Sequence, residues 1–408
     1  MIDLRKYGQI LYISSVDISL NNGPGVNERE FVFALQKAFG ERVHFLIPGP
    51  QNPVKEINSR NFTFSRSHRQ FNPVAYVVHL ISQFRLANIL LVSGKFEFLV
   101  FRLGILPLVE TCITRRYRVP YAIKTLGSLD ILLQQKGIKG ILGKALTPFG
   151  ERLFRDIASR ALAIDACTQV LVDYHQHRLS LAPSQIHLIE NATDTERFYP
   201  VDRMTARSRT GLCAFDPILG YVGGRPWERG GRQMVEIAPR LVQKYPSLGM
   251  VVLGGDSGVK RLKTRAQDLG VKDHCIFPGV VPYDRVPDFI NAFDVGISFD
   301  TEDRLNTYGN SSQKVRQYLS CGKPVVSGPG GNYFLDREGL GSIVEVDDLE
   351  QIMSATISWL SLTEEQRYVY SQRARSFAIE YLSVRKALND RIDFWNGRLG
   401  TSESKSMK

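Results

Sequence analysis

The segment Asn310–Gly331 constrains the fold of this chain more than any other stretch of the sequence. Its residues indicate a loop, a helix, a tight turn and a buried strand. Gly322 stands where a helix C-cap glycine belongs, and Pro324 after it should stop the helix. Val325 and Val326 then begin a short apolar strand. A helix that leads at once into a buried strand is typical of a domain built on a parallel sheet.

Polar residues at the start of the same helix suit an anion. Asn310 precedes Ser311 and Ser312, which are favourable N-cap residues, and Lys314 and Gln317 lie three residues apart on one helical face. A helix N-terminus with a lysine beside it is a natural phosphate site. A surface helix with a solvated lysine gives the same pattern, so the segment alone leaves both interpretations open.

Buried strands alternate with helices along most of the chain. The predicted strands are Gln9–Val16, Arg42–Ile47, Asn88–Val92, Pro120–Thr125, Thr168–Val172, Ile218–Gly224, Gly249–Gly255, His274–Val281 and Asp294–Ser298. This alternation predicts an α/β fold with mostly parallel sheets. The length of 408 residues is enough for two such domains.

A glycine-bearing loop, Asp17–Val26, separates the first predicted strand from a predicted helix, Asn27–Phe39. Gly23 and Gly25 would let the backbone approach a ligand closely. The loop lacks the G-x-G-x-x-G pattern, and no acidic residue follows at the spacing that holds a ribose. These departures disfavour an NAD-dependent dehydrogenase.

Two arginines follow a glycine turn after the predicted strand Ile218–Gly224. Arg225 and Arg229, in the sequence GRPWERGG, would suit a pyrophosphate, because guanidinium groups stay charged and bind oxygen atoms in pairs. Turns that follow parallel strands gather at one edge of the sheet. We therefore expect Arg225, Arg229 and Lys314 to converge on one diphosphate, with a surface ion pair as the alternative.

The net charge of +11 predicts an anionic partner. Phosphorylated substrates and a membrane surface both fit, whereas no nucleic-acid-binding module is recognisable.

The five cysteines show no CxxC spacing and have no neighbouring histidine, which indicates neither a metal site nor a disulfide framework and favours the reducing cytoplasm. The N-terminus indicates a strand rather than a signal peptide. We expect no apolar run long enough to span a membrane, since Glu97 and Arg102 interrupt the nearest candidate, Phe96–Val109.

Residues 133–160 combine basic and apolar side chains. The basic residues are Lys136, Lys139, Lys144, Arg152, Arg155 and Arg160. Such a mixture is typical of an interfacial helix, so the sequence predicts docking on an anionic membrane through this region. An ordinary domain helix with a solvated basic face is the alternative.

The segment around Lys314 resembles family 4 retaining glycosyltransferases, which have the GT-B fold. Their pattern K-x-x-E-Y-L-A-x-G-K-P-V is matched here at Lys314, Tyr318, Leu319, Gly322, Lys323, Pro324 and Val325. In that family a glutamate holds the ribose hydroxyls where this chain has Gln317. The commoner form with two glutamates would place its first acid at Gly309.

The resemblance is strong over Gly220–Val326 and weaker before it. GRPWERGG is similar to the family's G-R-x-x-x-K-G, whose two basic residues contact the donor phosphates. Ile189–Pro200 is similar to the segment that leads into the family's second domain. Leu126 stands where many members have a histidine that touches the transferred sugar.

The resemblance implies two Rossmann-like domains that face a cleft. Residues 1–200 would form the acceptor side and residues 201–384 the nucleotide-sugar side, with a helix at 385–399 crossing back and a disordered tail at 400–408. The implied catalytic residues are Arg225, Arg229 and Lys314, and the implied donor-binding residues are Gly25, Gly224, Asn310, Ser311, Ser312, Gln317 and Val281.

The implied activity is transfer of a sugar, with retention, from a nucleotide sugar to a hydroxyl of a glycan or lipid-linked glycan. No metal or cofactor is expected. The setting would be bacterial polysaccharide or glycolipid assembly, in the cytoplasm or on the inner face of the membrane. Because Gln317 and Leu126 depart from the family, a non-catalytic GT-B protein that binds a sugar nucleotide or serves as an assembly partner is the alternative.

Overall fold

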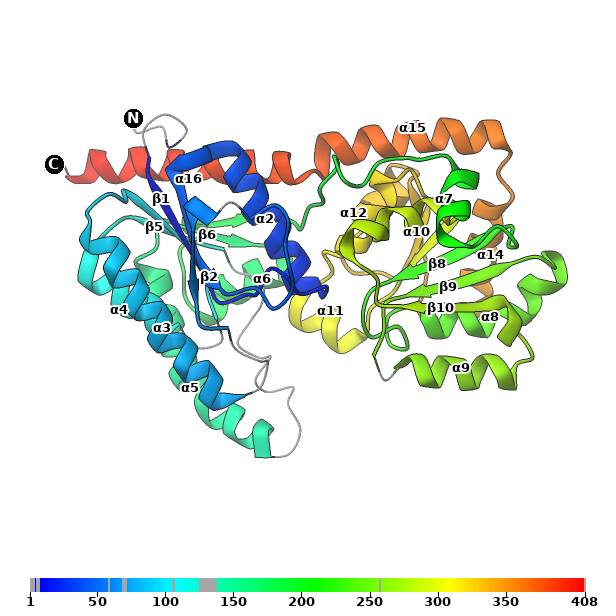
Figure 1. Ribbon diagram of the computed structural model, residues 1–408, viewed down its shortest axis with the longest axis horizontal. Coiled ribbons are helices and arrows are strands. Elements are labelled where there is room, and N and C mark those ends of the chain that lie inside the picture. The colour runs from blue at the N-terminus through cyan, green and yellow to red at the C-terminus, as the bar shows by residue number, and fades with distance from the viewer. Residues whose placement is uncertain are drawn as a thin grey trace. The chain divides into compact units, whose positions relative to one another are not determined.

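A computed structural model describes residues 4, 8–57, 59–67, 72–104, 107–124, 138–256 and 258–406, except for the side chains of residues 59, 73, 138–146 and 401–406. The chain divides into two compact units (Figure 1). Unit 1 comprises residues 1–20, 24–190 and 387–408, and unit 2 comprises residues 21–23 and 191–386. The chain thus leaves unit 1 at Glu190, ahead of the predicted boundary at residue 200.

Unit 1 is built on a seven-stranded parallel sheet in the order β3-β2-β1-β4-β5-β6-β7. Its strands are β1 (Ile10–Ser14), β2 (Val43–Pro48), β3 (Phe62–Ser65), β4 (Phe98–Arg102), β5 (Tyr121–Lys124), β6 (Ala163–Ala166) and β7 (Ile186–Leu188). The order reverses between β1 and β4. In doubly wound sheets such a reversal marks the edge where ligands bind.

Helices cover both faces of this sheet. They are α2 (Gly23–Phe39), α3 (Pro73–Val92), α4 (Leu108–Tyr117), α5 (Ile138–Ser159), α6 (Gln169–Asp173) and α16 (Val384–Ser406). Figure 1 shows α3, α4 and α5 on one face and α2 and α16 on the other. The strands alternate accordingly: Leu11 and Ile13 join the core on one face, and Ile10 and Tyr12 join the core on the other.

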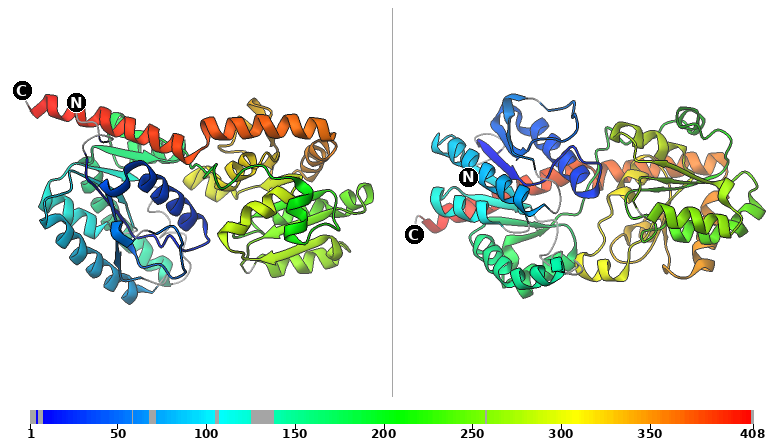
Figure 2. Two further views of the ribbon diagram at one scale, coloured as in Figure 1. Left: turned by 45° about the horizontal axis from the view of Figure 1, so that its top comes forward. Right: turned by 60° about the horizontal axis from the view of Figure 1, so that its bottom comes forward.

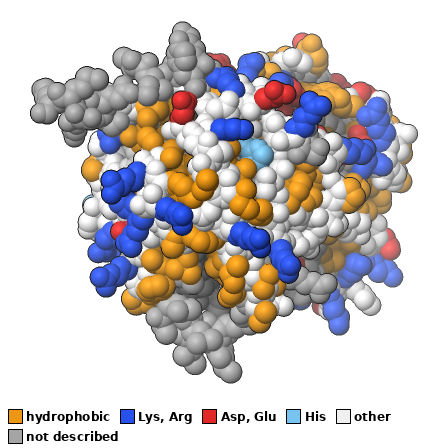
Figure 3. Space-filling view, turned by 60° about the vertical axis from the view of Figure 1, so that its left-hand side comes forward, with side chains coloured by type: hydrophobic (Ala, Val, Ile, Leu, Met, Phe, Trp, Pro, Cys, Tyr) orange, Lys and Arg blue, Asp and Glu red, His pale blue; other side chains and the backbone are white. Residues whose placement is uncertain are grey.

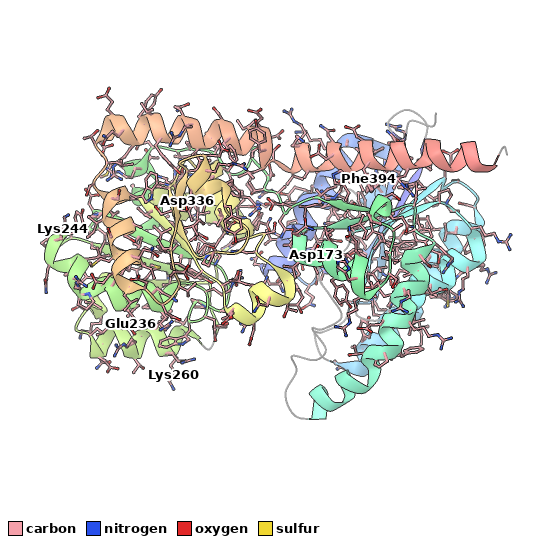
Figure 4. All side chains as sticks on the ribbon, turned by 180° about the vertical axis from the view of Figure 1, so that it is seen from behind. Asp173, Glu236, Lys244, Lys260, Asp336 and Phe394 are labelled. Atoms are coloured by element: carbon pink, nitrogen blue, oxygen red, sulfur yellow. The ribbon has the colours of Figure 1, made fainter. Side chains whose placement is uncertain are left out.

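The C-terminal helix α16 packs on unit 1. Trp395 is fully buried against Phe98 of β4, and the ring of Phe394 (Figure 4) lies 4.6 Å from that of His187 on β7. The helix extends to Ser406, so the prediction of a disordered tail from Gly400 is wrong over the residues that the structure describes. The apolar contacts of the earlier turns support continuation of the helix beyond the core.

Unit 2 repeats the architecture with a six-stranded parallel sheet in the order β10-β9-β8-β11-β12-β13. The strands are β8 (Ile218–Val222), β9 (Gly249–Leu253), β10 (Cys275–Gly279), β11 (Val295–Ser298), β12 (Val325–Ser327) and β13 (Gly341–Ile343). Here the order reverses between β8 and β11. The five strands predicted from residue 218 onward, including the one that begins at Val325, are all present within a few residues at each end.

The helices of unit 2 also form two layers (Figure 2). They are α7 (Arg203–Thr210), α8 (Gly231–Lys244), α9 (Gly258–Asp268), α10 (Val286–Ala292), α11 (Glu302–Tyr308), α12 (Gln313–Ser320), α13 (Phe334–Arg337), α14 (Leu349–Leu360) and α15 (Glu364–Tyr381). Helices α8, α9 and α14 pack together, and α7 with α10 and α12 with α15 form further pairs. Between α8 and α9, Glu236 (Figure 4) pairs with Arg265 at 2.8 Å.

Two strand glycines of unit 2 make room for aromatic side chains. A Cβ atom on Gly220 of β8 would lie 2.0 Å from the ring of Phe293, and one on Gly296 of β11 would lie 2.4 Å from the ring of Tyr318. Any larger residue would therefore force these rings off the sheet. The hydroxyl of Tyr318 in turn accepts a hydrogen bond from the Val222 amide at the end of β8.

Two strands predicted in the first half are helical. Asn88–Val92 forms the last turn of α3, and Thr168–Val172 becomes α6, where the Thr168 side chain caps the helix by accepting from the Leu171 amide. A five-residue apolar run does not distinguish a strand from a buried helical turn. The predicted loop Asp17–Val26 is also shorter than expected, because α2 begins at Gly23.

One described helix segment, Val74–Val92, is long and apolar enough to cross a membrane by length and composition. The expectation that no such segment exists was therefore wrong. It missed this segment because His79, Gln83 and Arg85 interrupt the apolar residues. In the structure 22% of the segment is buried.

Candidate anion-binding site in unit 2

Charged and neutral polar residues gather where the strand order of unit 2 reverses. The loop after β8 carries Arg225 and Arg229, and the segment after β11 carries Asp300, Arg304 and Asn310. Because β8 and β11 are parallel neighbours, both segments leave the same edge of the sheet. The backbone links them as well, since the Phe299 amide donates to the Arg229 carbonyl at 3.1 Å.

Asp300 holds two of the arginines. Its carboxylate accepts from Nε and Nη2 of Arg229 at 2.7 and 2.9 Å, and Nε of Arg304 lies 3.2 Å from the same carboxylate. Asp300 is only 3% exposed. A bidentate pair of this kind fixes the guanidinium plane. Asp300 therefore orients Arg229 and Arg304 without balancing all the positive charge around it.

Lys314 brings a further basic group to this edge from the first turn of α12. It is 7% exposed, and its Nζ atom lies 4.0 Å from the centre of the Tyr221 ring, a cation–π distance. Within the described residues Nζ has no hydrogen-bond partner. Burial, reinforced by Arg229 and Arg304 and opposed by Asp300, lowers the pKa of Lys314 well below its usual value. A buried amine without a partner would gain most from a bound anion.

Arg225 lies at the exposed side of the group. Its backbone has φ of 55°, in the left-handed region that favours glycine, and its amide donates to Asp256 at 2.9 Å. Burial, then Arg229, lowers the pKa of Arg304, and Arg225 adds to this effect. Arg225, Arg229 and Lys314 thus share one electrostatic environment with Arg304.

Asn310 adds neutral polar groups to the same edge. It is 3% exposed, and neither its amide oxygen nor its amide nitrogen has a hydrogen-bond partner among the described residues. The chain around it is tightly held, because a Cβ atom on Gly331, whose φ is 134°, would lie 2.1 Å from the Asn310 carbonyl oxygen. Buried side-chain amides are usually hydrogen-bonded, so a ligand that bonds to the Asn310 side chain would explain this exception.

The hydroxyl groups of Ser311 and Ser312 are already engaged. Oγ of Ser311 accepts from the Asn191 amide at 2.8 Å, and Oγ of Ser312 lies 3.2 Å from Oγ of Ser298. Ser312 is the N-cap residue of α12, as the sequence suggested, but its side chain makes no capping bond. These hydroxyls therefore hold the loop in place, and donor binding by Ser311 and Ser312 stays a prediction.

The other predicted donor-binding residues have different surroundings. Gln317 is 5% exposed on α12, and its side-chain amide has no hydrogen bond to the described residues. The Gly224 carbonyl accepts from the Tyr221 hydroxyl at 2.7 Å, and Val281 is half-buried after β10. Gly25 lies in unit 1, in the first turn of α2. Leu126 lies outside the described residues.

Asp300 and Arg304 were not identified from the sequence. Their ion pair spans four residues at the start of a helix, and that spacing is a usable signal. The bond from Asp300 to Arg229 crosses 71 residues, which no local pattern reveals.

The sequence of unit 2 is similar to known glycosyltransferases. A family model described as "Glycosyl transferases group 1" matches residues 203–377, less than half of the chain. The D-inositol 3-phosphate glycosyltransferase of Acidothermus cellulolyticus is 30% identical over 154 residues, 36% of this chain and 33% of that protein. The GDP-mannose-dependent alpha-(1-6)-phosphatidylinositol monomannoside mannosyltransferase of Mycolicibacterium smegmatis is 27% identical over 174 residues, 40% of this chain and 44% of that protein. The matches thus span between a third and a half of these relatives.

Solved structures resemble nearly the whole chain. HepE from Anabaena, in complex with UDP and glucose, has a TM-score of 0.69 at 14% identity and covers 95% of this chain and 99% of its own. Sucrose-phosphate synthase from Thermosynechococcus elongatus has a TM-score of 0.72 at 17% identity, with coverage of 98% and 100%. At such identity the likeness shows the fold, which is GT-B, with two Rossmann-like units as expected.

Proposed function

We propose that this protein is a glycosyltransferase that moves a sugar from a nucleotide-sugar donor to an acceptor hydroxyl. The observation that carries the proposal is the buried amine of Lys314, which lacks a hydrogen-bond partner among the described residues and lies close to Arg229 and Arg304. It is supported by the match of residues 203–377 to group 1 glycosyl transferases. The diphosphate of the donor would supply the missing anion.

The chemistry would be mainly electrostatic. As the glycosidic bond breaks, negative charge grows on the leaving diphosphate, and fixed cations stabilise it more in the transition state than in the ground state. Lys314 and Arg229 would contact the phosphate oxygens, while Asp300 keeps Arg229 oriented. Arg225 would close over the diphosphate from the exposed side. We propose further that transfer retains the anomeric configuration and needs no metal ion or other cofactor.

Neutral groups would orient the rest of the donor. The unsatisfied amide of Asn310 can donate and accept at once, as sugar hydroxyls require. Gln317 would bond the ribose neutrally in place of the family's glutamate. The backbone of Gly224, the turn at Val281 and the loop held by Ser311 and Ser312 would complete the donor side of unit 2.

We propose a glycan or a lipid-linked glycan as acceptor, in bacterial polysaccharide or glycolipid assembly, on the cytoplasmic side of the membrane. The names of the two relatives, which specify an inositol phosphate and a phosphatidylinositol mannoside, support a role in glycolipid synthesis. Nucleic acid is not a proposed partner.

Release of nucleoside diphosphate tests the proposal. The protein is first screened against nucleotide sugars by thermal shift, because a ligand that binds the folded state raises the melting temperature. Slow donor hydrolysis without acceptor is then expected for the stabilising donor, and Lys314→Met should abolish it. A protein that is stabilised by no nucleotide sugar would contradict the proposal.

A second candidate is a non-catalytic GT-B protein that binds a sugar nucleotide or acts in an assembly. The neutral Gln317 and the absence of an acid at Gly309 favour it, since charge-assisted bonds to a ribose are stronger than neutral ones. Tight donor binding without turnover on glycan or lipid-linked acceptors would identify this case.

A further inference from the structure

Helix α3 presents an apolar stripe to solvent. Its exposed apolar side chains are Val74, Val77, Ile81, Phe84, Ile89 and Val92, each between 37% and 73% exposed. Spacings of three and four residues place most of them on one helical face. The helix has 20 residues, so the stripe is about 30 Å long. Apolar side chains gathered in this way on a surface mark an interaction site more often than scattered ones do.

The opposite face of α3 is partly polar and fixes the orientation of the helix. The buried His79 bonds through its ring nitrogens to Oγ of Ser65 and Oγ of Ser15, both at 3.2 Å. The buried Gln83 donates to the Ser14 carbonyl at the end of β1 at 3.0 Å. Rotating the helix so that the stripe faced inward would break these hydrogen bonds. The buried groups on the strand ends would then be left without hydrogen-bond partners. The outward position of the apolar residues is therefore built into the fold.

The charges near the stripe are mainly positive. Arg85 is the one charged residue of α3, and it is exposed with no ion pair to the described residues. Arg66, next to the helix through its amide bond to Oγ of Ser82, is exposed as well, as is Arg116 on the neighbouring α4. Figure 3 views the molecule from the side on which α3 and α4 lie in Figure 1 and shows apolar side chains interspersed with Lys and Arg and few acidic groups.

We propose that α3 docks the protein on an anionic membrane. The helix would lie along the interface with its apolar stripe at the boundary between headgroups and acyl chains, while the arginines contact anionic headgroups. This surface differs from residues 133–160, which the sequence suggested, and the side chains of Lys136, Lys139 and Lys144 lie outside the described set. The inference deepens the proposed function by placing a lipid-linked acceptor within reach, but docking itself does not depend on sugar transfer.

Charge favours a membrane over a second copy of this chain. A two-fold dimer brings the same surface of both copies together. Around α3 such a dimer would bring Arg85 and the neighbouring arginines close to the same arginines of the other copy. Like charges that face each other across an interface are unfavourable. Anionic lipid complements the same arginines.

Vesicle flotation tests the proposal. The full chain is mixed with vesicles of phosphatidylcholine plus phosphatidylglycerol, or of phosphatidylcholine alone, at low salt. We expect binding to the anionic vesicles, and we expect Val77→Glu/Ile81→Glu to weaken it by about tenfold or more, because each change removes a side chain that the lipid would bury. Val369→Glu/Ile379→Glu on α15 is the matched control, since it replaces an exposed valine and isoleucine with the same change in charge. This control should bind like wild type.

Three results would overturn the proposal. They are no binding of wild type to anionic vesicles, equal weakening by both double variants, or a wild-type dimer that Val77→Glu/Ile81→Glu converts to monomer while vesicle binding is unchanged. Melting temperature and circular dichroism of each variant verify folding, and both should match wild type because the substituted residues are exposed. Vesicle binding without binding of any sugar nucleotide would refute the proposed function and leave this inference standing.

Discussion

The two units place charged residues at the same point of the same strand order, yet they treat those charges differently. In unit 1 the reversal between β1 and β4 is occupied by Glu28, which accepts from Tyr12 and pairs with Arg102 and, at 3.3 Å, with Lys124. In unit 2 the reversal between β8 and β11 holds four basic residues around Asp300. The charged groups of unit 1 pair with one another, whereas in unit 2 the Lys314 amine has no hydrogen-bond partner among the described residues.

The pKa shifts of unit 1 show how complete its pairing is. Burial alone would raise the pKa of Glu28, but Arg102 and Lys124 outweigh burial and hold it at about 2. Burial lowers the pKa of Lys124 to about 7, against the attraction of Glu28. Beside them, Asp165 on β6 accepts from Arg391 of α16 at 2.7 Å. This network therefore joins strands and helices of unit 1 through its own ion pairs.

The comparison teaches that buried charge alone does not mark a site. Lys124 and Lys314 are both buried at the edge of a parallel sheet, and burial lowers the pKa of both. Lys124 bonds to Glu28 and Asn27, whereas Nζ of Lys314 has no hydrogen bond within the described chain. The lack of a partner, rather than burial, distinguishes a candidate ligand site from a structural ion pair.

The largest effect is expected when the closed network of unit 1 is broken. Glu28→Gln removes the carboxylate and leaves Arg102 and Lys124 buried without it. Loss of one partner from a buried pair costs ~3–5 kcal/mol of unfolding free energy. Denaturant unfolding followed by circular dichroism measures this cost. A loss below about 1 kcal/mol, the range of surface pairs, would mean that the network does not stabilise unit 1.

A smaller effect, on catalysis rather than folding, is expected in unit 2. Lys314→Ala and Arg225→Ala should each raise the activation barrier for donor cleavage by ~2–4 kcal/mol, as does loss of one oxyanion donor. Arg229→Lys should be the mildest change, since the family carries lysine there. Turnover is followed by nucleoside diphosphate release, and unfolding curves serve as the control. Equal losses of stability and activity would assign these residues to the fold.

The smallest effect is expected at Gln317. If its buried amide meets the donor ribose, Gln317→Ala should weaken donor binding by ~0.5–1.5 kcal/mol, the worth of one neutral hydrogen bond. Gln317→Glu should preserve or tighten binding, because a carboxylate makes stronger bonds. Titration calorimetry on wild type, Gln317→Ala and Gln317→Glu measures the three donor affinities. Identical affinities would remove Gln317 from the donor site.

The sequence predicted unit 2 better than unit 1. In unit 2 the strands Ile218–Gly224 and Asp294–Ser298 are bounded by clear turns, and parallel-strand topology was enough to expect that the segments after them leave the same edge of the sheet. In unit 1 helix α3 carries an outward apolar stripe in addition to the apolar residues that it packs into the core. Its inward residues His79 and Gln83 are satisfied by strand ends that no local pattern identifies.

Pairs between distant segments explain what else the sequence did not predict. Asp300 could not be singled out, because its partner Arg229 is 71 residues away. Ser311 and Ser312 were expected to face a ligand, but Asn191 and Ser298 occupy their hydroxyls. In both cases a tertiary contact, which the local sequence does not reveal, decides what the side chain does.

Proton uptake on binding tests the central claim most directly. Burial and the neighbouring arginines lower the pKa of Lys314, and a bound diphosphate should raise it again, so binding should take up a proton. Affinity should accordingly be highest below the pKa of the free Lys314 amine and should fall as pH rises from that pKa to the higher pKa of the complex. Calorimetry of UDP and GDP binding in buffers with different ionisation enthalpies measures this uptake. The account predicts uptake in wild type and none in Lys314→Met, which should fold as stably. Equal uptake and equal affinity in the two proteins would contradict it.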